Sequence, residues 1–281
     1  MIRSVTVCAD DFGLSRGITD SILQTVDEGP VTQVSVIPNG EAVEYALAEY
    51  QKRKERLALA VHVNLTEGKP LSSSRAIPHL VDVRGFFRYG VAGLWLAYLT
   101  ASPRTRHALR VEVRTELSAQ LACIRTLSGV DRIGVNGHQH AHLLPFVFDE
   151  LVALGGISAI RTLREPFIGG ASLSRYAARL VLKVLSRRAV RGAARYGIAV
   201  NDFFVGFVHS GQMTEERLRA GFARAEGSGE ALFHPGSALP GELASWKESR
   251  ADISWHYSPW RARERTTLVR LSRDAIVRFL R

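Results

Sequence analysis

The sequence predicts an α/β fold, a distorted TIM-barrel-like (β/α) barrel with about seven strands. Short β-branched runs alternate with longer segments of helical period, which is typical of repeated βα units and a parallel sheet. The 281 residues, 46% of them hydrophobic and 23% charged, are enough for one large buried core. Polar residues also gather at the ends of the predicted strands, which is where barrels place their active sites.

In chain order, the predicted strands cover residues 4–9, 33–37, 57–63, 132–136, 159–163, 203–208 and 231–234. The predicted helices cover residues 15–28, 41–55, 104–128, 145–154, 173–196, 214–225 and 263–280. The chain shows no internal repeat or obvious linker. We therefore expect one domain over residues 1–281, with an Arg-rich helical insertion near 171–200.

Composition and targeting signals predict a cytoplasmic protein. Two cysteines, Cys8 and Cys123, cannot form a disulfide framework and suit a reducing compartment. The apolar stretch at the N-terminus is too short for a signal peptide. The apolar run at 91–99 is about half of the roughly 20 residues that a membrane-spanning helix needs.

The net charge of +10 comes mostly from one segment. Residues 171–200 hold seven basic residues and no acidic one, while the other 30 basic residues nearly balance the 27 acidic residues. Most of the segment's basic residues recur at steps of four: Arg175, Arg179, Lys183, Arg187, Arg191 and Arg195. Such a row forms an oblique basic ridge on a helix, either a solvated face or a surface for an anionic membrane. A regional charge of this kind argues against nucleic-acid binding.

Two adjacent carboxylates, Asp10 and Asp11, end the first predicted strand, before Ser15, a plausible helix N-cap. Two buried carboxylates are costly side by side unless they share a cation or a proton. One could bind a metal while the other takes a proton from water. A turn followed by a helix cap is the alternative interpretation.

A strand histidine and a histidine run add candidate metal ligands. Strand alternation places His62 and Asn64 on one face, although a single strand histidine is often structural. His138, His140 and His142 recur at alternating positions directly after a predicted strand. Because imidazole is the commonest metal ligand, this run indicates metal binding, but the spacing does not decide which histidine binds.

Two further strand ends carry polar side chains. His234 precedes a Pro-Gly turn and could protonate a leaving amine, or be only a turn residue. Arg164 and Glu165 end another strand, where Arg164 could orient a substrate or form a structural ion pair.

Together these residues resemble the YdjC family of carbohydrate deacetylases, whose best-known branch is the chitooligosaccharide deacetylases. The resemblance is carried by ADDFGLS at 9–15, VTQVSVIPN at 31–39, VHVNLTEGKP at 61–70, HQHAH at 138–142, RE at 164–165 and FHPG at 233–236. It implies a barrel-like fold, with one divalent metal ion, zinc or magnesium, bound by Asp11, His62 and His138. Asn39, Asn64, His140, His142, Arg164 and Glu165 are the candidate substrate-binding residues.

The implied chemistry is N-deacetylation of an amino sugar by metal-assisted hydrolysis. Asp10 would take the proton of water, and His234 would stabilise the oxyanion or protonate the leaving amine. One departure stands out: the family often has His-x-Asp-Ser before the histidine run, where this chain has GVNG at 134–137. The residues that usually orient the site there are therefore missing.

A closer resemblance is to the hopanoid-biosynthesis deacetylase (HpnK) branch. It is carried by AIPHLVD at 76–82, NDFF at 201–204, SGQM at 210–213 and the Arg-rich insertion. It implies an N-acetylglucosaminyl hopanoid glycolipid as substrate and peripheral contact of the 175–195 helix with the inner face of the membrane. A chitooligosaccharide deacetylase, a metal-dependent phosphoesterase and a non-enzymatic lipid or glycan binder are the alternatives, and a homodimer stays open.

Overall fold

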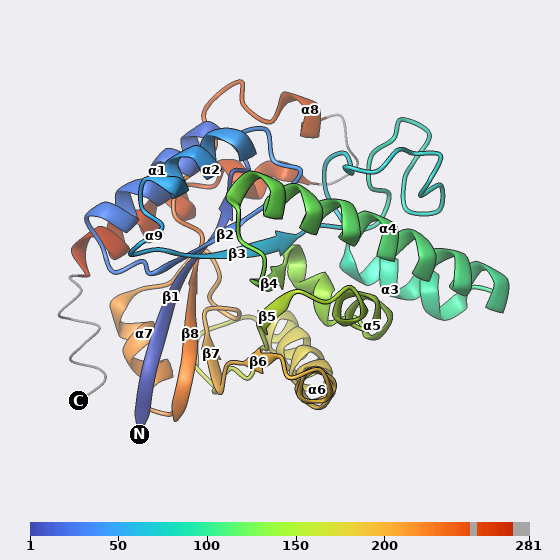
Figure 1. Ribbon diagram of the computed structural model, residues 1–281. Helices are drawn as coiled ribbons and strands as arrows, with labels where there is room; N and C mark the ends of the chain where they lie inside the picture. Colours follow the sequence, from blue (N-terminus) through green and yellow to red (C-terminus); the bar gives the residue numbers. More distant parts are fainter. Residues whose placement is uncertain (248–251, 272–281) are drawn as a thin grey trace.

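A single curled parallel sheet organises the protein in the computed structural model, which describes residues 1–247 and 252–271. The sheet has eight strands in the order β6-β5-β4-β3-β2-β1-β8-β7 and forms a half-barrel with helices on its outside (Figure 1). The strands are β1 (Ile2–Phe12), β2 (Gln33–Val36), β3 (Ala58–Val63), β4 (Ile133–Gly137), β5 (Ile157–Ile160), β6 (Ala199–Val200), β7 (Phe203–Val205) and β8 (Gly227–Phe233).

Helices connect the strands. They are α1 (Arg16–Asp27), α2 (Val43–Gln51), α3 (Val91–Thr100), α4 (Pro103–Ser128), α5 (Pro145–Ala153), α6 (Leu173–Arg195), α7 (Glu215–Phe222), α8 (Ala244–Lys247) and α9 (Pro259–Arg270), with 3-10 turns η1 (His138–Leu143) and η2 (Ile253–Tyr257). In the described part of the chain, no helix is both long and apolar enough to cross a membrane.

The predicted distorted α/β barrel is confirmed, although some of its elements differ from the prediction. The described sheet has eight strands rather than about seven, because β6 has only two residues and its pattern is too short to recognise. The apolar run near residue 91 forms a helix that was not predicted, α3. The last predicted helix, 263–280, coincides with α9 as far as Arg270, and residues 272–280 lie outside the described residues.

Parallel pairing brings the candidate site residues to one edge of the sheet. β1 lies between β8 and β2, and β3 lies between β2 and β4, so their carboxyl ends are neighbours. The register pairs His62 on β3 with Asn136 on β4. After β1, Ser15 caps α1 as predicted, since its side chain accepts a hydrogen bond from the amide of Ile18.

The inner face of α4 holds the long segment that follows β3. Glu112, Glu116 and Gln120, spaced four residues apart, are all buried. Glu116 accepts hydrogen bonds from the amides of Leu71 and Ser72, at 3.0 and 2.8 Å, and the Gln120 amide group bonds both the N–H and the carbonyl of Asn64. This helix therefore fixes the chain on both sides of residue 67.

Replacing Glu116 by Ala should lower the free energy of unfolding by about 1–3 kcal/mol, because two part-buried hydrogen bonds to a buried carboxylate are lost. Urea denaturation followed by tryptophan fluorescence measures this change. Glu55→Ala is the control, since Glu55 is exposed. Equal stability of the two variants would contradict the role given to α4.

Candidate metal centre and active site

Three buried side chains converge at the carboxyl edge of the sheet. Asp11 Oδ1 lies 3.5 Å from His62 Nε2 and 3.5 Å from His138 Nδ1, and the two ring nitrogens are 3.3 Å apart. Asp11 Oδ1 has no hydrogen-bond partner among the described residues. An unpartnered buried carboxylate oxygen facing two imidazole nitrogens fits a divalent cation. Asp11, His62 and His138 could therefore hold one metal ion.

The outer nitrogen of His62 is fixed by an asparagine. His62 Nδ1 lies 2.7 Å from Asn136 Oδ1, which also accepts a hydrogen bond from Ser35 Oγ at 2.6 Å. Because that oxygen can only accept, His62 carries its proton on Nδ1 and turns the Nε2 lone pair toward Asp11. Asn136 lies in the GVNG stretch that departs from the family pattern, so this chain still supplies an orienting residue there.

A carboxylate performs the same task for His138. Glu67 Oε2 lies 3.1 Å from His138 Nε2 and 2.9 Å from His256 Nε2, while Gln139 donates to Glu67 Oε1 at 2.7 Å. Glu67, His138 and His256 thus form a second group of possible ligands. Since both Glu67 oxygens already accept hydrogen bonds, we assign Glu67 to orienting His138.

Arginines neutralise the two aspartates separately. Arg161 donates to both oxygens of Asp10, at 2.6 and 2.7 Å, and to Glu230. Arg261, from α9, donates to Asp11 Oδ2 at 2.7 Å and so leaves Oδ1 for a metal. Burial alone would raise the pKa of each aspartate, but the guanidinium beside each holds the pKa well below its ordinary range.

The electrostatics of the group call for a positive charge. Burial would lower the pKa of His138, but the carboxylates of Glu67 and Asp11 outweigh it and raise the pKa to about 10. Without a metal, a proton on His138 therefore partly neutralises the negative charge of the surrounding carboxylates. A divalent cation would replace that proton, which is the usual coupling of metal binding to proton release.

His234 lies beside this group at the end of β8. Its Nδ1 is 3.2 Å from Ser210 Oγ, and its ring packs edge-on against Trp255. Burial lowers the pKa of His234 to about 4, so the imidazole is neutral at neutral pH. A neutral imidazole whose Nδ1 accepts from Ser210 presents an Nε2–H donor.

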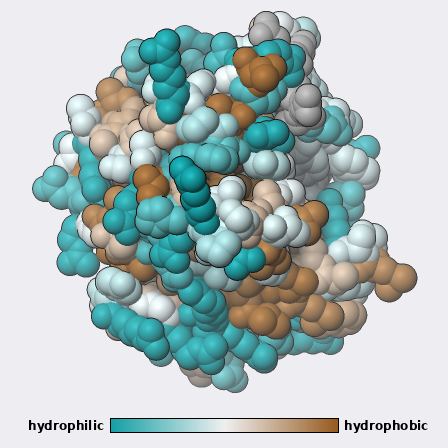
Figure 2. Space-filling model, turned by 90° about the vertical axis from the view of Figure 1, so that its right-hand side faces the viewer, coloured by the Kyte–Doolittle hydropathy of each residue, from teal (hydrophilic) through white to brown (hydrophobic). Residues whose placement is uncertain are grey.

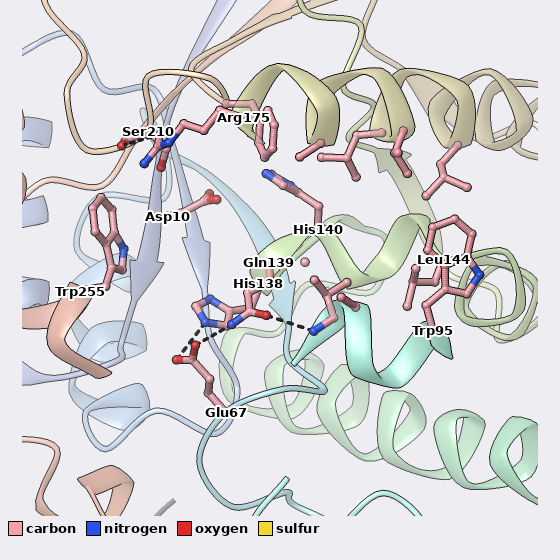
Figure 3. Close-up of a pocket in the computed structure, with 18 of the residues that line it drawn as sticks. Asp10, Glu67, Trp95, His138, Gln139, His140, Leu144, Arg175, Ser210 and Trp255 are labelled. Atoms are coloured by element: carbon pink, nitrogen blue, oxygen red, sulfur yellow. Dashed lines mark hydrogen bonds and ion pairs between the residues drawn. The ribbon is translucent and has the colours of Figure 1, made fainter. Parts of the chain in front are cut away.

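A pocket of about 670 Å³ opens over these residues. Asp10, His62, His138 and His234 line its polar end. The opposite end is apolar and lies between two helices: it is lined by Val91, Ala92 and Trp95 of α3, by Ala178, Val181, Leu182 and Leu185 of α6, and by Leu144 and Phe207. Figure 3 shows Asp10, Glu67, His138 and Trp255 at one end and Trp95 and Leu144 at the other.

The chain matches the model of the YdjC-like protein family over residues 4–272. It belongs to this family. A human carbohydrate deacetylase is 33% identical over 248 residues, covering 83% of this chain and 74% of the relative. A mouse carbohydrate deacetylase is 33% identical over 231 residues, covering 79% of this chain and 71% of the relative.

A solved structure supports the fold of this YdjC-like protein. A protein from Enterococcus faecalis, described as a cellobiose-phosphate cleavage protein, superimposes with a TM-score of 0.66. The match covers 98% of this chain and 93% of the other, at 19% sequence identity. At that identity the likeness concerns the fold alone.

The other two histidines of the run lie near the candidate metal ligands of this YdjC-like protein but are not among them. His140 lines the pocket, with its ring centroid 5.4 Å from that of Phe207. His142 is buried, and its Nε2 donates to the carbonyl of Arg161 at 3.0 Å. Burial lowers the pKa of both, that of His142 to about 3. Of the three histidines, only His138 faces Asp11.

Asn39 and Asn64, which were expected to bind substrate, instead stabilise the turn that follows β3. Asn64 Oδ1 accepts from the amides of Thr66 and Glu67 at 3.0 and 3.1 Å, and its Nδ2 donates to Asn39 Oδ1 at 3.0 Å. Asn39 in turn donates to the carbonyls of Glu67 and Lys69. Neither asparagine lines the pocket. They shape the turn that carries Glu67.

The structure does not bring Arg164 and Glu165 into the pocket either. Glu165 is buried, and its carboxylate accepts from the amides of Gly206, Phe207 and Val208 at 2.7–3.1 Å. Arg164 faces away, with its guanidinium 3.5 Å from Asp202 Oδ1. The strand end places Arg161, three residues earlier, in the site.

Sequence reasoning missed Glu67, Arg161 and His256. Arg161 was hidden because it falls inside a predicted strand, where an arginine is usually exposed. Glu67 lies within the VHVNLTEGKP stretch, and its position after a strand was the available signal. His256 gave no local signal, since only the folded chain brings η2 beside β3.

Titration should find one metal ion per chain, bound by Asp11, His62 and His138. His62→Asn should weaken zinc binding by about 100-fold or more, because a direct ligand is lost. His256→Asn should weaken it by about tenfold at most, because it removes only a contact to Glu67. Isothermal titration calorimetry on the metal-free chain measures both. Loss of binding in His256→Asn with retention in His62→Asn would instead place the ion at the second group.

Proposed function

We propose that this YdjC-like protein is a metal-dependent N-deacetylase of N-acetylated amino sugars. The main support for this proposal is that two adjacent aspartates have different partners. Asp11 faces two histidines, while Asp10, held by Arg161, lines the pocket beside them. One carboxylate is thus available to a metal and the other to a water molecule, which is the division that amide hydrolysis needs. The human and mouse carbohydrate deacetylases support the sugar substrate.

The donor atoms favour zinc over magnesium. Two of the three candidate ligand atoms, His62 Nε2 and His138 Nδ1, are imidazole nitrogens, which suit zinc, whereas magnesium prefers oxygen ligands. When bound, the cation would polarise the acetamide carbonyl and lower the pKa of water.

The chain's own residues complete the hydrolysis. Asp10 accepts a proton from the attacking water, and Arg161 keeps the carboxylate oriented and ionised. The C–O bond forms at the acetamide carbon, and the neutral His234 imidazole donates a hydrogen bond to the oxyanion. The C–N bond then breaks, the amine takes up the proton that Asp10 accepted from water, and acetate leaves.

The apolar end of the pocket supports a glycolipid substrate. Gln139 and His140 line the middle of the pocket, and the end farthest from His138 is lined by aliphatic and aromatic side chains, among them Trp95, Leu144 and Leu182 (Figure 3). A second sugar would leave its hydroxyls without partners there, whereas a hydrocarbon group would be desolvated favourably. Together with the resemblance to the HpnK branch, this favours the N-acetylglucosaminyl group of a hopanoid over a chitooligosaccharide.

The phosphoesterase and the binding-only alternatives are less well supported. Two-metal phosphoesterases need two adjacent ions, but the two ligand groups here use opposite nitrogens of the one His138 ring. That ring would have to lose both N–H protons to serve two ions. A non-enzymatic lipid or glycan binder would have no use for a buried carboxylate pair with its own arginines.

Asp10→Asn should reduce acetate release from an N-acetylglucosaminyl substrate by about 100-fold or more, because an amide cannot accept the proton of water. Enzymatic quantification of free acetate measures the loss. Zinc affinity, measured in parallel, should stay close to that of the unchanged chain. The control is Asp131→Asn at an exposed position. Undiminished acetate release from Asp10→Asn would exclude the proposed mechanism.

Substrate choice is tested by comparing acetate release from an N-acetylglucosaminyl hopanoid in detergent and from N,N′-diacetylchitobiose. The glycolipid should give the higher kcat/KM, by about tenfold or more, since an apolar group buried in the pocket adds binding energy that a sugar lacks. A chelator should abolish both reactions. A preference for chitobiose would assign the chain to oligosaccharides.

A further inference from the structure

Helix α3 exposes an unusual amount of apolar surface beside the pocket. Its ten residues, Val91–Thr100, include no charged side chain, and Leu94 alone among them is buried. Leu96 and Leu99 are 61% and 53% exposed. An uncharged helix on the surface of a protein is costly in water unless another surface covers it.

Helix α6 faces the pocket from the other side with a second apolar surface. Leu173, Leu180 and Val184 follow one another at helical spacing, and they are 87%, 59% and 61% exposed. The same stripe continues as Arg187, Arg191 and Arg195, which are exposed and have no ion-pair partner among the described residues. The outer face of α6 therefore changes from apolar to basic along its length.

Both surfaces are continuous with the lining of the pocket. Val91, Ala92 and Trp95 of α3 and Val181 of α6 line its apolar end, and Val181 is also 45% exposed. We name the exposed residues around this opening the mouth surface: Leu96, Leu99, Leu173, Leu180, Val181 and Val184. A molecule entering the apolar end of the pocket would pass between these side chains.

The two segments that carry the mouth surface are basic, although Arg84 and Arg110 pair with Asp82 and Glu150. Residues 83–111, which contain α3, include five arginines and no acidic residue, and residues 171–200, which contain α6, include seven basic residues and none that is acidic. Not all of this charge is free, since Arg179 is buried against the carbonyl of Glu165 and Arg188 pairs with Asp149. Figure 2, which views the side where α3 and α6 lie, shows hydrophobic side chains gathered low on the face beside a hydrophilic band.

We propose that the mouth surface docks on an anionic phospholipid bilayer. Leucines of both helices enter the boundary between headgroups and acyl chains, and Arg187, Arg191 and Arg195 contact lipid phosphates. The pocket then opens directly toward the membrane, so an amphiphilic substrate can enter without crossing water. This proposal rests on the proposed function only for its substrate, because the docking itself needs no catalysis.

Vesicle flotation tests the docking on the full-length chain. Phosphatidylcholine vesicles containing phosphatidylglycerol should carry the protein, and vesicles of phosphatidylcholine alone should carry about tenfold less. The double variant Leu180→Ser with Val184→Ser should bind the anionic vesicles about tenfold more weakly, because two exposed apolar side chains that enter the membrane are lost. Neither residue lines the pocket, so acetate release from a water-soluble N-acetylated sugar should be unchanged.

The matched control is Leu127→Ser, another exposed leucine, at the far end of the 26-residue α4. It should bind vesicles like the unchanged chain. Binding of the double variant equal to that of the control would overturn the proposal. So would a dimer, seen by light scattering, that the double variant converts to monomer without any vesicle binding by the unchanged chain. Inactivity toward every sugar with intact vesicle binding would overturn the proposed function and leave the docking standing.

Discussion

Burial of two adjacent carboxylates at the end of β1 is the constraint on which the rest of the site depends. Asp10 and Asp11 are almost fully shielded from water, so each requires its own positive partner. Arg161 comes from the end of β5 and Arg261 from α9, and each is itself buried. The pairs therefore tie the first strand to elements about 150 and 250 residues away in the chain. The same ion pairs therefore neutralise the carboxylates and hold distant parts of the chain against the first strand.

The same logic extends outward from the candidate metal ligands. Asn136 turns His62 and fixes its tautomer, and the Glu67 carboxylate lies 3.1 Å from the outer nitrogen of His138. Glu67 is in turn held by the turn that Asn64 shapes, and Asn64 by Gln120 of α4. A neutral amide serves one histidine and a carboxylate the other. The two ligand nitrogens are therefore unequal in basicity, although both face Asp11.

The local sequence pattern was enough to predict the parallel α/β architecture, because the alternation of β-branched runs and segments of helical period can be read directly from the sequence. The positions at strand ends predicted that Asp11, His62 and the histidine run share one edge of the sheet, and the family resemblance selected His138; the structure brings these three side chains together. Position at a strand end could not show which of Arg161 and Arg164 points into the site, because that depends on the curl of the folded sheet. The contact of His256 could not be predicted from the sequence, since its partner Glu67 is 189 residues away in the chain.

Backbone strain is concentrated where the chemistry is expected. Of the four described non-glycine residues with left-handed backbone, Asp11, Gln139 and His140 belong to this site, with φ of 66°, 50° and 57°. Each such residue costs on the order of 1–3 kcal/mol, which packing elsewhere must offset. Substitutions chosen to make this protein more heat-resistant would face a trade-off here. Glycine at these positions would relax the backbone, but it would remove a candidate metal ligand, Asp11, and two side chains that line the pocket, Gln139 and His140.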